Sequence, residues 1–192
     1  MINIKAIIVA FVLLLLRGSN AFAADDVSVP PILQVQLLTK LLPYERNFDA
    51  RAGDHVHVLI VAKGQSALSL RTQGQLLHAL QEVPSLGGLP HSEISLFYRS
   101  TQELMAQIKG MHSTLLYLMP GFSSEQVQEI ATALIGTDIL SVSAAASDVA
   151  TGMVLSFDLV SGKPVIQINI AQAKRQHVDF TSSLLGLARV IQ

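Results

Sequence analysis

The chain has 192 residues, of which 50% are hydrophobic and 14% are charged, and its formal net charge is −1 with histidine neutral. This composition can fill a sizeable core, and it lacks the positive charge that attracts nucleic acid or an anionic membrane. Because there is no cysteine, a disulfide framework, a thiol nucleophile, a thiolate metal site and a lipid-attachment cysteine are all excluded.

The first 23 residues read as a secretory signal peptide. A positive charge at Lys5 precedes the unbroken apolar run of residues 6–16, and Ala21-Phe22-Ala23 is a small-x-small cleavage site. The run is shorter than the 18 or so apolar residues of a membrane-spanning helix, although an uncleaved anchor is the alternative. We therefore expect an exported, periplasmic protein in which residues 24–192 form a single domain with no membrane insertion after cleavage.

The predicted elements begin with a helix over residues 30–42, where two prolines suit the first turn and leucines recur at helical spacing. Residues 44–54 read as a polar connection. The strand of residues 55–62 follows, and from Val58 onward it is apolar on both faces. This pattern is typical of a parallel strand that helices cover on each side.

Helices and strands alternate through the middle of the chain. Ser66 is placed to cap the helix after the first strand, and Ser100 with Glu103 and Ser123 with Gln126 read as capping boxes of the next two helices. The alternation indicates βαβ units and a mainly parallel sheet. The further strands of this region are predicted at residues 93–98, 114–119 and 139–142.

The pattern changes after a loop-like stretch at residues 144–151. Residues 153–160 and 165–170 alternate apolar with polar side chains around a tight turn at Ser161-Gly162, which predicts an antiparallel hairpin. Two helices, over residues 172–176 and 182–191, are expected to close the chain. The predicted fold is a Rossmann-like, three-layer α/β domain, with a mainly parallel sheet and an antiparallel C-terminal hairpin at one edge.

The C-terminal stretch resembles the signature of the YfiR-like family. The resemblance is carried by Ile166-Gln-Ile-Asn-Ile170, Ala171-Gln-Ala-Lys-Arg175 and the run from Ser182 to Ile191, and it extends to the opening helix and Arg51-Ala-Gly-Asp54. The residues of the family signature are Asn169, Ser182, Ser183, Leu184, Leu185 and Ala188. Read from the residues alone, Ser182 or Ser183 is expected to cap the last helix rather than to contact a ligand.

The resemblance implies regulation rather than catalysis. It implies a periplasmic, non-enzymatic protein that binds the periplasmic sensing region of a membrane diguanylate cyclase or histidine kinase. Repression of that partner would restrain cyclic di-GMP synthesis and biofilm formation. The resemblance also implies a possible homodimer, but the disulfide control known in the family has no counterpart in a chain without cysteine.

The loops after the strands are the alternative binding site, because ligands in parallel sheets bind outside the carboxyl ends of the strands. The strand-to-helix turn of residues 63–66 can hold an anion at the start of the following helix. It lacks the sequence fingerprints of phosphate-binding and dinucleotide-binding loops, so an ordinary turn is the competing interpretation. The function that competes with partner binding is a small-ligand sensory module at this rim. Its candidate residues are Lys63, Gly64, Ser66, Ser100 and Thr101, together with the loop of residues 143–146.

No residue pattern points to catalysis, a cofactor or a metal. The chain has no G-x-S-x-G elbow and no evident carboxylate pair, and an unrecognised hydrolase is kept only as a third hypothesis. His55 and His57 share one face of a strand and could bind a metal, but hydrogen-bonded histidines are the competing reading.

The opening helix is the candidate interface. Leu33, Leu37 and Leu41 recur every four residues and would line one side of it. They either pack in the core or contact a partner or a second copy, and the sequence leaves both readings open.

Overall fold

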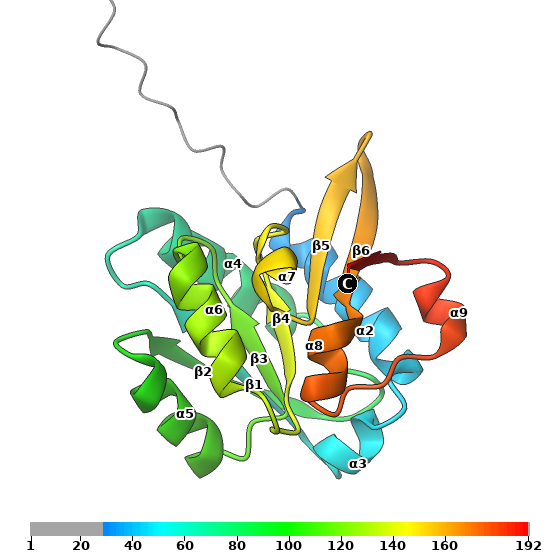
Figure 1. Cartoon of the computed structure of the whole chain (residues 1–192), viewed down its shortest axis with the longest axis horizontal. Helices are drawn as coiled ribbons and strands as arrows, with labels where there is room; N and C mark the ends of the chain where they lie inside the picture. The colour runs from blue at the N-terminus through cyan, green and yellow to red at the C-terminus, as the bar shows by residue number, and fades with distance from the viewer. Residues whose placement is uncertain (1–28, 192) are drawn as a thin grey trace, which may run out of the picture.

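The computed structural model describes residues 29–191, and it has a seven-stranded sheet with the strand order β2-β1-β3-β4-β5-β6-β7 (Figure 1). The predicted signal peptide, residues 1–23, lies outside the described residues. In chain order the elements are α2 (Pro31–Leu41), η1 (Leu42–Tyr44), α3 (Phe48–Ala52), β1 (Val56–Ala62), α4 (Ala67–Gln81), β2 (His91–Phe97), α5 (Thr101–Gly110), β3 (Leu115–Leu118), α6 (Ser124–Ala133), β4 (Leu140–Ser143), α7 (Asp148–Thr151), β5 (Leu155–Val160), β6 (Lys163–Asn169), α8 (Ile170–Arg175), α9 (Ser182–Leu185) and β7 (Arg189–Ile191).

The sheet is mainly parallel, as predicted. Strands β2, β1, β3, β4 and β5 run in one direction, and β6 returns antiparallel to β5. Strand β5 pairs with β4 only through Leu155 and Ser156, so the outer part of the β5–β6 hairpin projects beyond the sheet (Figure 1). The predicted fold class, with its antiparallel hairpin, is confirmed.

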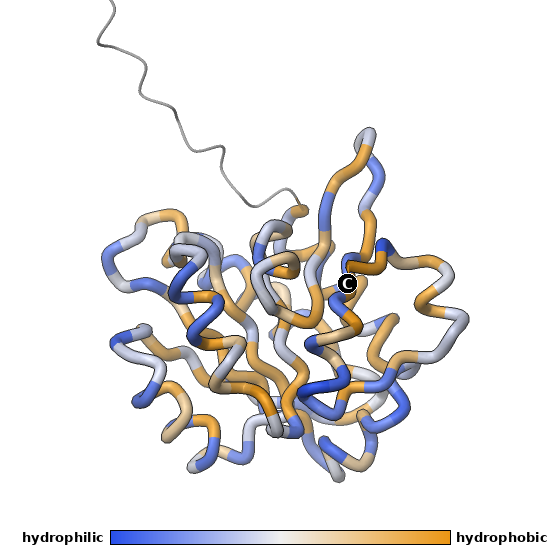
Figure 2. Tube along the Cα trace, in the orientation of Figure 1, coloured by the Kyte–Doolittle hydropathy of each residue, from blue (hydrophilic) through white to orange (hydrophobic). Residues whose placement is uncertain are grey.

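Strand β1 divides its side chains between two hydrophobic clusters. Val58 and Ile60 pack in the cluster that includes the buried side of α2 and α4, whereas Leu59 and Val61 pack with α5 and α6. All four are at most 1% exposed. The prediction that this strand is covered on both faces is therefore confirmed, and Figure 2 shows the hydrophobic strands within a more hydrophilic exterior.

The end of the chain differs from the prediction. A helix was expected over residues 182–191, but α9 ends at Leu185 and residues 189–191 form β7, which pairs parallel with β6. Gly186 follows the helix directly, and Val190 and Ile191 are β-branched residues that favour a strand when an open edge is available. The hairpin is consequently not the edge of the sheet, because β7 lies outside it.

Two predicted connections contain short helices. The polar connection of residues 44–54 includes α3, which buries Phe48 at 1% exposure in the core. The loop-like residues 144–151 include the single turn α7, which buries Val149. Neither segment has a helical stripe of apolar residues: Phe48 attaches the first to the core, and Ala144, Ala145 and Val149 attach the second.

No helix within residues 29–191 is both long enough and apolar enough to cross a membrane.

Candidate functional site

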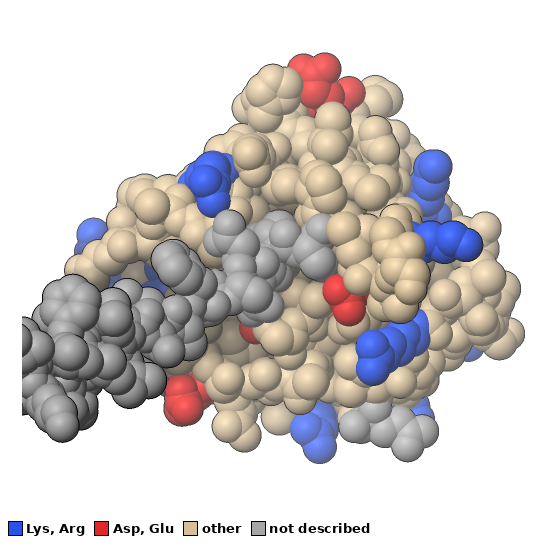
Figure 3. All heavy atoms as spheres, turned by 90° about the horizontal axis from the view of Figure 1, so that it is seen from above, with Lys and Arg blue, Asp and Glu red and all other residues tan. Residues whose placement is uncertain are grey.

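The candidate ligand rim lies where the parallel strands end, on the side toward which the hairpin projects. Figure 3 looks at the molecule from this side and shows isolated basic and acidic groups on a largely uncharged surface. The ends of β1 and β3 form the topological switch point of the sheet, because the chain leaves β1 toward β2 and returns to β3 on the other side.

Lys63 follows β1 at this switch point. Its Nζ donates a 3.0 Å hydrogen bond to Oε1 of Gln126 at the start of α6, and it lies 5.7 Å from the centre of the Phe122 ring. Its backbone N–H donates to Oγ of Ser69 at 2.9 Å. The cation expected to attract a ligand is thus held by the protein's own groups.

Ser66 caps α4, as predicted, because its Oγ accepts the backbone N–H of Ser69 at 3.2 Å. Gly121 lies against it from the β3–α6 loop with φ of 97°, and a Cβ at that glycine would come within 3.0 Å of Ser66 Oγ. Gly64 lies beside Phe97 at the end of β2. The loops after β1 and β3 therefore approach each other closely.

The other rim residues also have partners within the fold. Ser100 caps α5 by accepting the N–H of Glu103, and the buried Thr101 shares a 2.9 Å hydrogen bond with the hydroxyl of Tyr98. Ser143 donates to Oδ2 of Asp148 at 2.6 Å. The rim residues are brought to one edge of the sheet, and the polar atoms of these three make hydrogen bonds within their own loops.

The two strand histidines are joined by a serine. Oγ of Ser92 lies 3.0 Å from Nε2 of His55 and 3.2 Å from Nδ1 of His57. The hydrogen-bonded interpretation of these histidines is the one that the geometry supports. Within residues 29–191, no group of three or more His, Asp or Glu side chains is placed to hold a metal ion.

Asn169 has a structural position at the start of α8. Its Oδ1 accepts the N–H of Gln172 at 2.9 Å, and its Nδ2 donates to the carbonyl of Val149 at 3.0 Å. Gln172 in turn donates from Nε2 to the carbonyl of Ala131 in α6 at 2.8 Å. This signature asparagine thus connects β6, α7 and α8.

The serines of the signature do not cap α9. The N-cap residue is Thr181, and Ser182 and Ser183 are exposed inside the short helix. Thr181 makes no side-chain capping hydrogen bond either, and its hydroxyl instead lies 3.0 Å from Oγ of Ser183, so the expected serine cap is wrong. The apolar members of the signature hold this segment to the main core: Leu184 is buried, and Leu185 and Ala188 are partly buried against it.

A buried ion pair, which the sequence did not indicate, connects the N-terminal part of the chain to this C-terminal segment. Nη1 of Arg51 contacts Oε2 of Glu45, with the two side chains 4% and 0% exposed. Glu45 Oε1 also accepts the N–H of Asp179 at 2.9 Å, and Nη2 of Arg51 donates to the carbonyl of His177 at 3.1 Å. The Arg51-Ala-Gly-Asp54 stretch noted in the sequence therefore positions residues 177–179.

A hollow of about 750 Å³ lies at the opposite edge of the sheet from the rim. Its lining includes His112 and His177, which follow α5 and α8 and have positive φ angles of 49° and 53°. Lys109 and Asp138 also line it, and Nδ1 of His177 lies 2.8 Å from Oδ1 of Asp138. The two histidines are 65 positions apart, so no local sequence pattern could bring them together.

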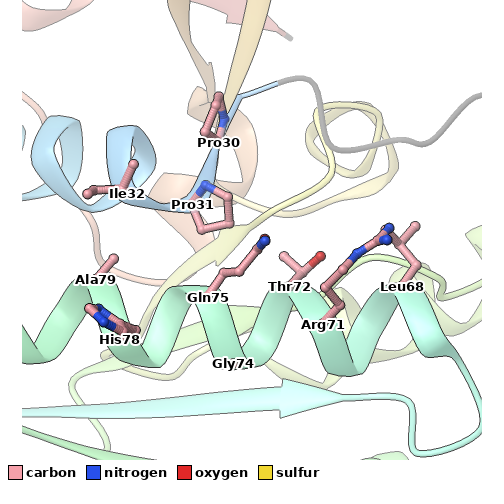
Figure 4. Close-up of a pocket in the computed structure, with 10 residues that line it drawn as sticks. All are labelled: Pro30, Pro31, Ile32, Leu68, Arg71, Thr72, Gly74, Gln75, His78 and Ala79. Atoms are coloured by element: carbon pink, nitrogen blue, oxygen red, sulfur yellow. The ribbon is translucent and has the colours of Figure 1, made fainter.

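The candidate interface on α2 is only partly accessible. Leu41 is 2% exposed and belongs to the core, whereas Leu33 and Leu37 are partly buried against it. Ile32, which the leucine spacing overlooked, is 56% exposed. It borders a groove of about 680 Å³ between the start of α2 and the side of α4 that carries Arg71, Gln75 and His78 (Figure 4).

Comparison with known proteins identifies the family. A family model described as YfiR/HmsC-like matches residues 92–189, which is just over half of the chain. The chain belongs to the YfiR/HmsC-like family. A search of the curated proteins finds no match. YfiR/HmsC-like proteins are periplasmic regulatory proteins, and the matched region contains the whole C-terminal signature except its last two residues.

Solved structures resemble this YfiR/HmsC-like chain in fold. An ABC domain in complex with L-Trp from Streptococcus pneumonia has a TM-score of 0.58 at 13% identity, covering 84% of this chain and 62% of its own. A ligand-free, open substrate binding protein with adhesive properties from Clostridium difficile has a TM-score of 0.61 at 12% identity, covering 85% and 60%. A conserved domain protein from Vibrio cholerae has a TM-score of 0.60 at 13% identity, and the match covers 86% of this chain and 61% of that protein.

At these identities the likeness concerns the fold alone. The YfiR/HmsC-like chain spans about 60% of the length of the solved structures that it matches. The fold they share is the α/β arrangement that sequence patterning predicts.

Proposed function

We propose that this YfiR/HmsC-like protein binds the periplasmic region of a membrane signalling protein, a diguanylate cyclase or a histidine kinase, and represses its output. The observation that carries the proposal is membership of a family of periplasmic regulatory proteins. In this account residues 1–23 are a cleaved signal peptide and the rest of the chain acts as one unit. Lower partner activity would then lower cyclic di-GMP and biofilm formation where the partner is a cyclase.

The exposed side of α2 is our candidate contact surface for the sensor. Ile32 is 56% exposed on it, and the partly buried Leu33 and Leu37 lie on the same helix. Burying such apolar side chains against a partner contributes about 25 cal/mol per Å² of apolar surface removed from water, before the entropy costs of association are subtracted. The groove beside Ile32 gives a partner side chain a place to insert.

Crosslinking in the periplasm tests the proposal. The whole chain, tagged at its C-terminus, is expressed in its own cells, and membrane proteins crosslinked to it are identified by mass spectrometry. We expect specific recovery of a cyclase or kinase with a periplasmic region, and loss of that recovery with Ile32→Glu. Ile135→Glu is the matched control, since Ile135 is 48% exposed on the far side of the sheet after α6. Recovery of the protein alone would contradict the proposal.

Ligand sensing is the second candidate function, and the observation that favours it is the hollow lined by His112 and His177. The rim is less favoured as a ligand site, because the side chains of Lys63, Ser66 and Ser143 already form hydrogen bonds with other residues of the protein. A small molecule that raises the melting temperature of the isolated protein would support ligand sensing. Partner capture that needs no added ligand would support the leading proposal.

A further inference from the structure

The groove between the start of α2 and α4 is positively charged along one side. Arg71, Gln75 and His78 line it at the spacing of a single helix face, and Figure 4 shows Gln75 reaching from α4 toward Pro31, with Arg71 farther along the same helix. Arg71 carries a permanent positive charge. Among the described residues that line the groove, none is acidic. A segment that binds there should therefore carry negative charge.

The rest of the groove is largely apolar. Pro31 and Ile32 of α2 line it together with Leu68 and Ala79 of α4, and Ile32 is 56% exposed. Apolar surface of this kind favours an apolar side chain that leaves water. A segment that combines acidic groups with one apolar side chain would match both parts of the groove.

The chain enters the described fold at the edge of this groove. Val29 is completely buried, and its carbonyl accepts a 2.7 Å hydrogen bond from Nε2 of Gln34. Pro30 and Pro31, which follow it, line the groove. Residues 24–28 lie outside the described residues, and their sequence is Ala-Asp-Asp-Val-Ser, which has two carboxylates and one large apolar side chain. The segment next to the groove thus has the composition that the groove requires.

We propose that residues 24–28, here called the N-terminal arm, bind in this groove once the signal peptide is cleaved after Ala23. Asp25 and Asp26 would pair with Arg71, and Val27 would contact the apolar lining. Cleavage adds one positive amino group, so the arm keeps an excess of negative charge, two carboxylates against one amine.

The arm is long enough for this contact. Five extended residues span about 17 Å. The row from Arg71 to His78 extends for about 10 Å along α4, because a helix rises about 1.5 Å per residue. The arm can therefore follow the whole row from its attachment at Val29.

Covalent attachment favours the arm over an acidic segment of another protein. Exposed ion pairs contribute little by themselves and are screened by salt. A tether of a few residues, however, holds the arm near the groove at an effective concentration in the millimolar range. Weak contacts are then sufficient for the groove to be occupied by the protein's own chain.

The arm would compete with the membrane partner, and this consequence rests on the proposed function. The groove borders Ile32, which is the exposed residue of the proposed sensor contact. A sensor that uses this surface would have to displace the arm, which lowers its apparent affinity. Binding of the arm itself does not depend on the sensor.

Disulfide formation in this cysteine-free chain tests arm binding without the sensor. The full chain with Val27→Cys and Gln75→Cys is exported, purified and reduced, and the rate at which the intramolecular disulfide forms is measured by mass spectrometry. Because the tether alone brings the two thiols near each other, the informative quantity is the dependence of this rate on charge. The intact mass should also show a chain that begins at Ala24.

Neutralising either side of the contact should slow the disulfide. We expect Asp25→Asn with Asp26→Asn, and separately Arg71→Gln, to lower the rate about fivefold, and all three together to lower it no further. Lys174→Gln is the control, because it removes an exposed positive charge that does not line the groove. Equal rates in all variants would overturn the proposal. So would a chain that begins after Asp26, or disulfides that form between molecules instead of within one.

Crosslinking to the sensor is the second measurement. With Asp25→Asn and Asp26→Asn in the otherwise unmodified chain, we expect more sensor to be recovered than with the unmodified protein. Equal recovery would overturn the competition. Recovery of no sensor with either protein would contradict the proposed function instead, because the disulfide rates are measured without the sensor.

Discussion

The hydroxyl of Tyr117 donates a 2.6 Å hydrogen bond to Oε1 of Gln34, and both side chains are completely buried. Gln34 also donates from Nε2 to the carbonyls of Val29 and Ala144, at 2.7 and 3.4 Å. This polar link joins the start of α2 to β3 and to the loop after β4. It therefore fixes the helix that carries the candidate sensor surface.

Breaking this link should destabilise the protein. With Gln34→Met, the Tyr117 hydroxyl is left buried without a partner, at a cost of about 1–3 kcal/mol. Tyr117→Phe should cost a similar amount, and the double variant less than the sum of the two. Urea unfolding of the four proteins measures the coupling, and strictly additive losses would contradict the link.

The same tyrosine should make stability fall at alkaline pH. Burial raises the pKa of the Tyr117 hydroxyl well above its ordinary value of about 10. Above that pH the unfolded chain loses this proton while the folded protein keeps it, so the free energy of unfolding decreases as pH rises, by up to about 1.4 kcal/mol per pH unit. Below pH 10 the contribution is fully present. Tyr117→Phe should show a shallower decline in denaturant titrations above pH 10, and parallel curves would contradict the assignment.

Arg51 should be far more important to stability than its exposed neighbour Arg46. Arg51→Met leaves the buried Glu45 carboxylate without its cation, which should cost about 3–5 kcal/mol. Arg46→Met removes the exposed ion pair with Asp179, whose side chains are 55% and 54% exposed, and should cost under about 1 kcal/mol. Hydrogen exchange should also increase around residues 177–180 only in the first variant.

His112→Gly should stabilise the protein. His112 follows α5 with φ of 49°, a left-handed conformation that costs an ordinary residue about 1–2 kcal/mol and glycine very little. Its imidazole has no hydrogen bond within residues 29–191, so the substitution removes strain without removing a hydrogen bond. We expect a gain of about 0.5–1 kcal/mol, after the entropy cost of glycine, by thermal or urea unfolding. A loss would indicate that the imidazole contributes packing.

Local patterns accounted for strands β1 to β6 and for most helix starts. Val58 to Val61 is readable as a doubly covered strand because every side chain is apolar, and Ser66 and Ser123 form the predicted caps. Strand β7 could not be predicted from local patterns, because the sequence from Leu187 to Ile191 is also compatible with a helix. It becomes a strand by pairing with the edge of β6, which is distant in sequence. The candidate site was less predictable, since its geometry depends on contacts between distant residues.

The buried polar residues illustrate that limit. Glu45 meets Asp179, and Gln34 meets Tyr117, across more than 80 positions in both cases. Leu41 and Leu33 have the same helical spacing, yet only the packing of α2 distinguishes the buried one from the partly accessible one. Ile32 lies off the leucine stripe, so it was visible only as an exposed side chain in the fold.

The most direct test of the proposed function uses the membrane protein recovered by crosslinking. Its output, cyclic di-GMP synthesis for a cyclase or autophosphorylation for a kinase, is measured in membrane vesicles with increasing amounts of this protein on the periplasmic side. We predict that output falls in a saturable way, that Ile32→Glu shifts the curve to higher concentration, and that Ile135→Glu does not. Output unchanged at every concentration would contradict the account.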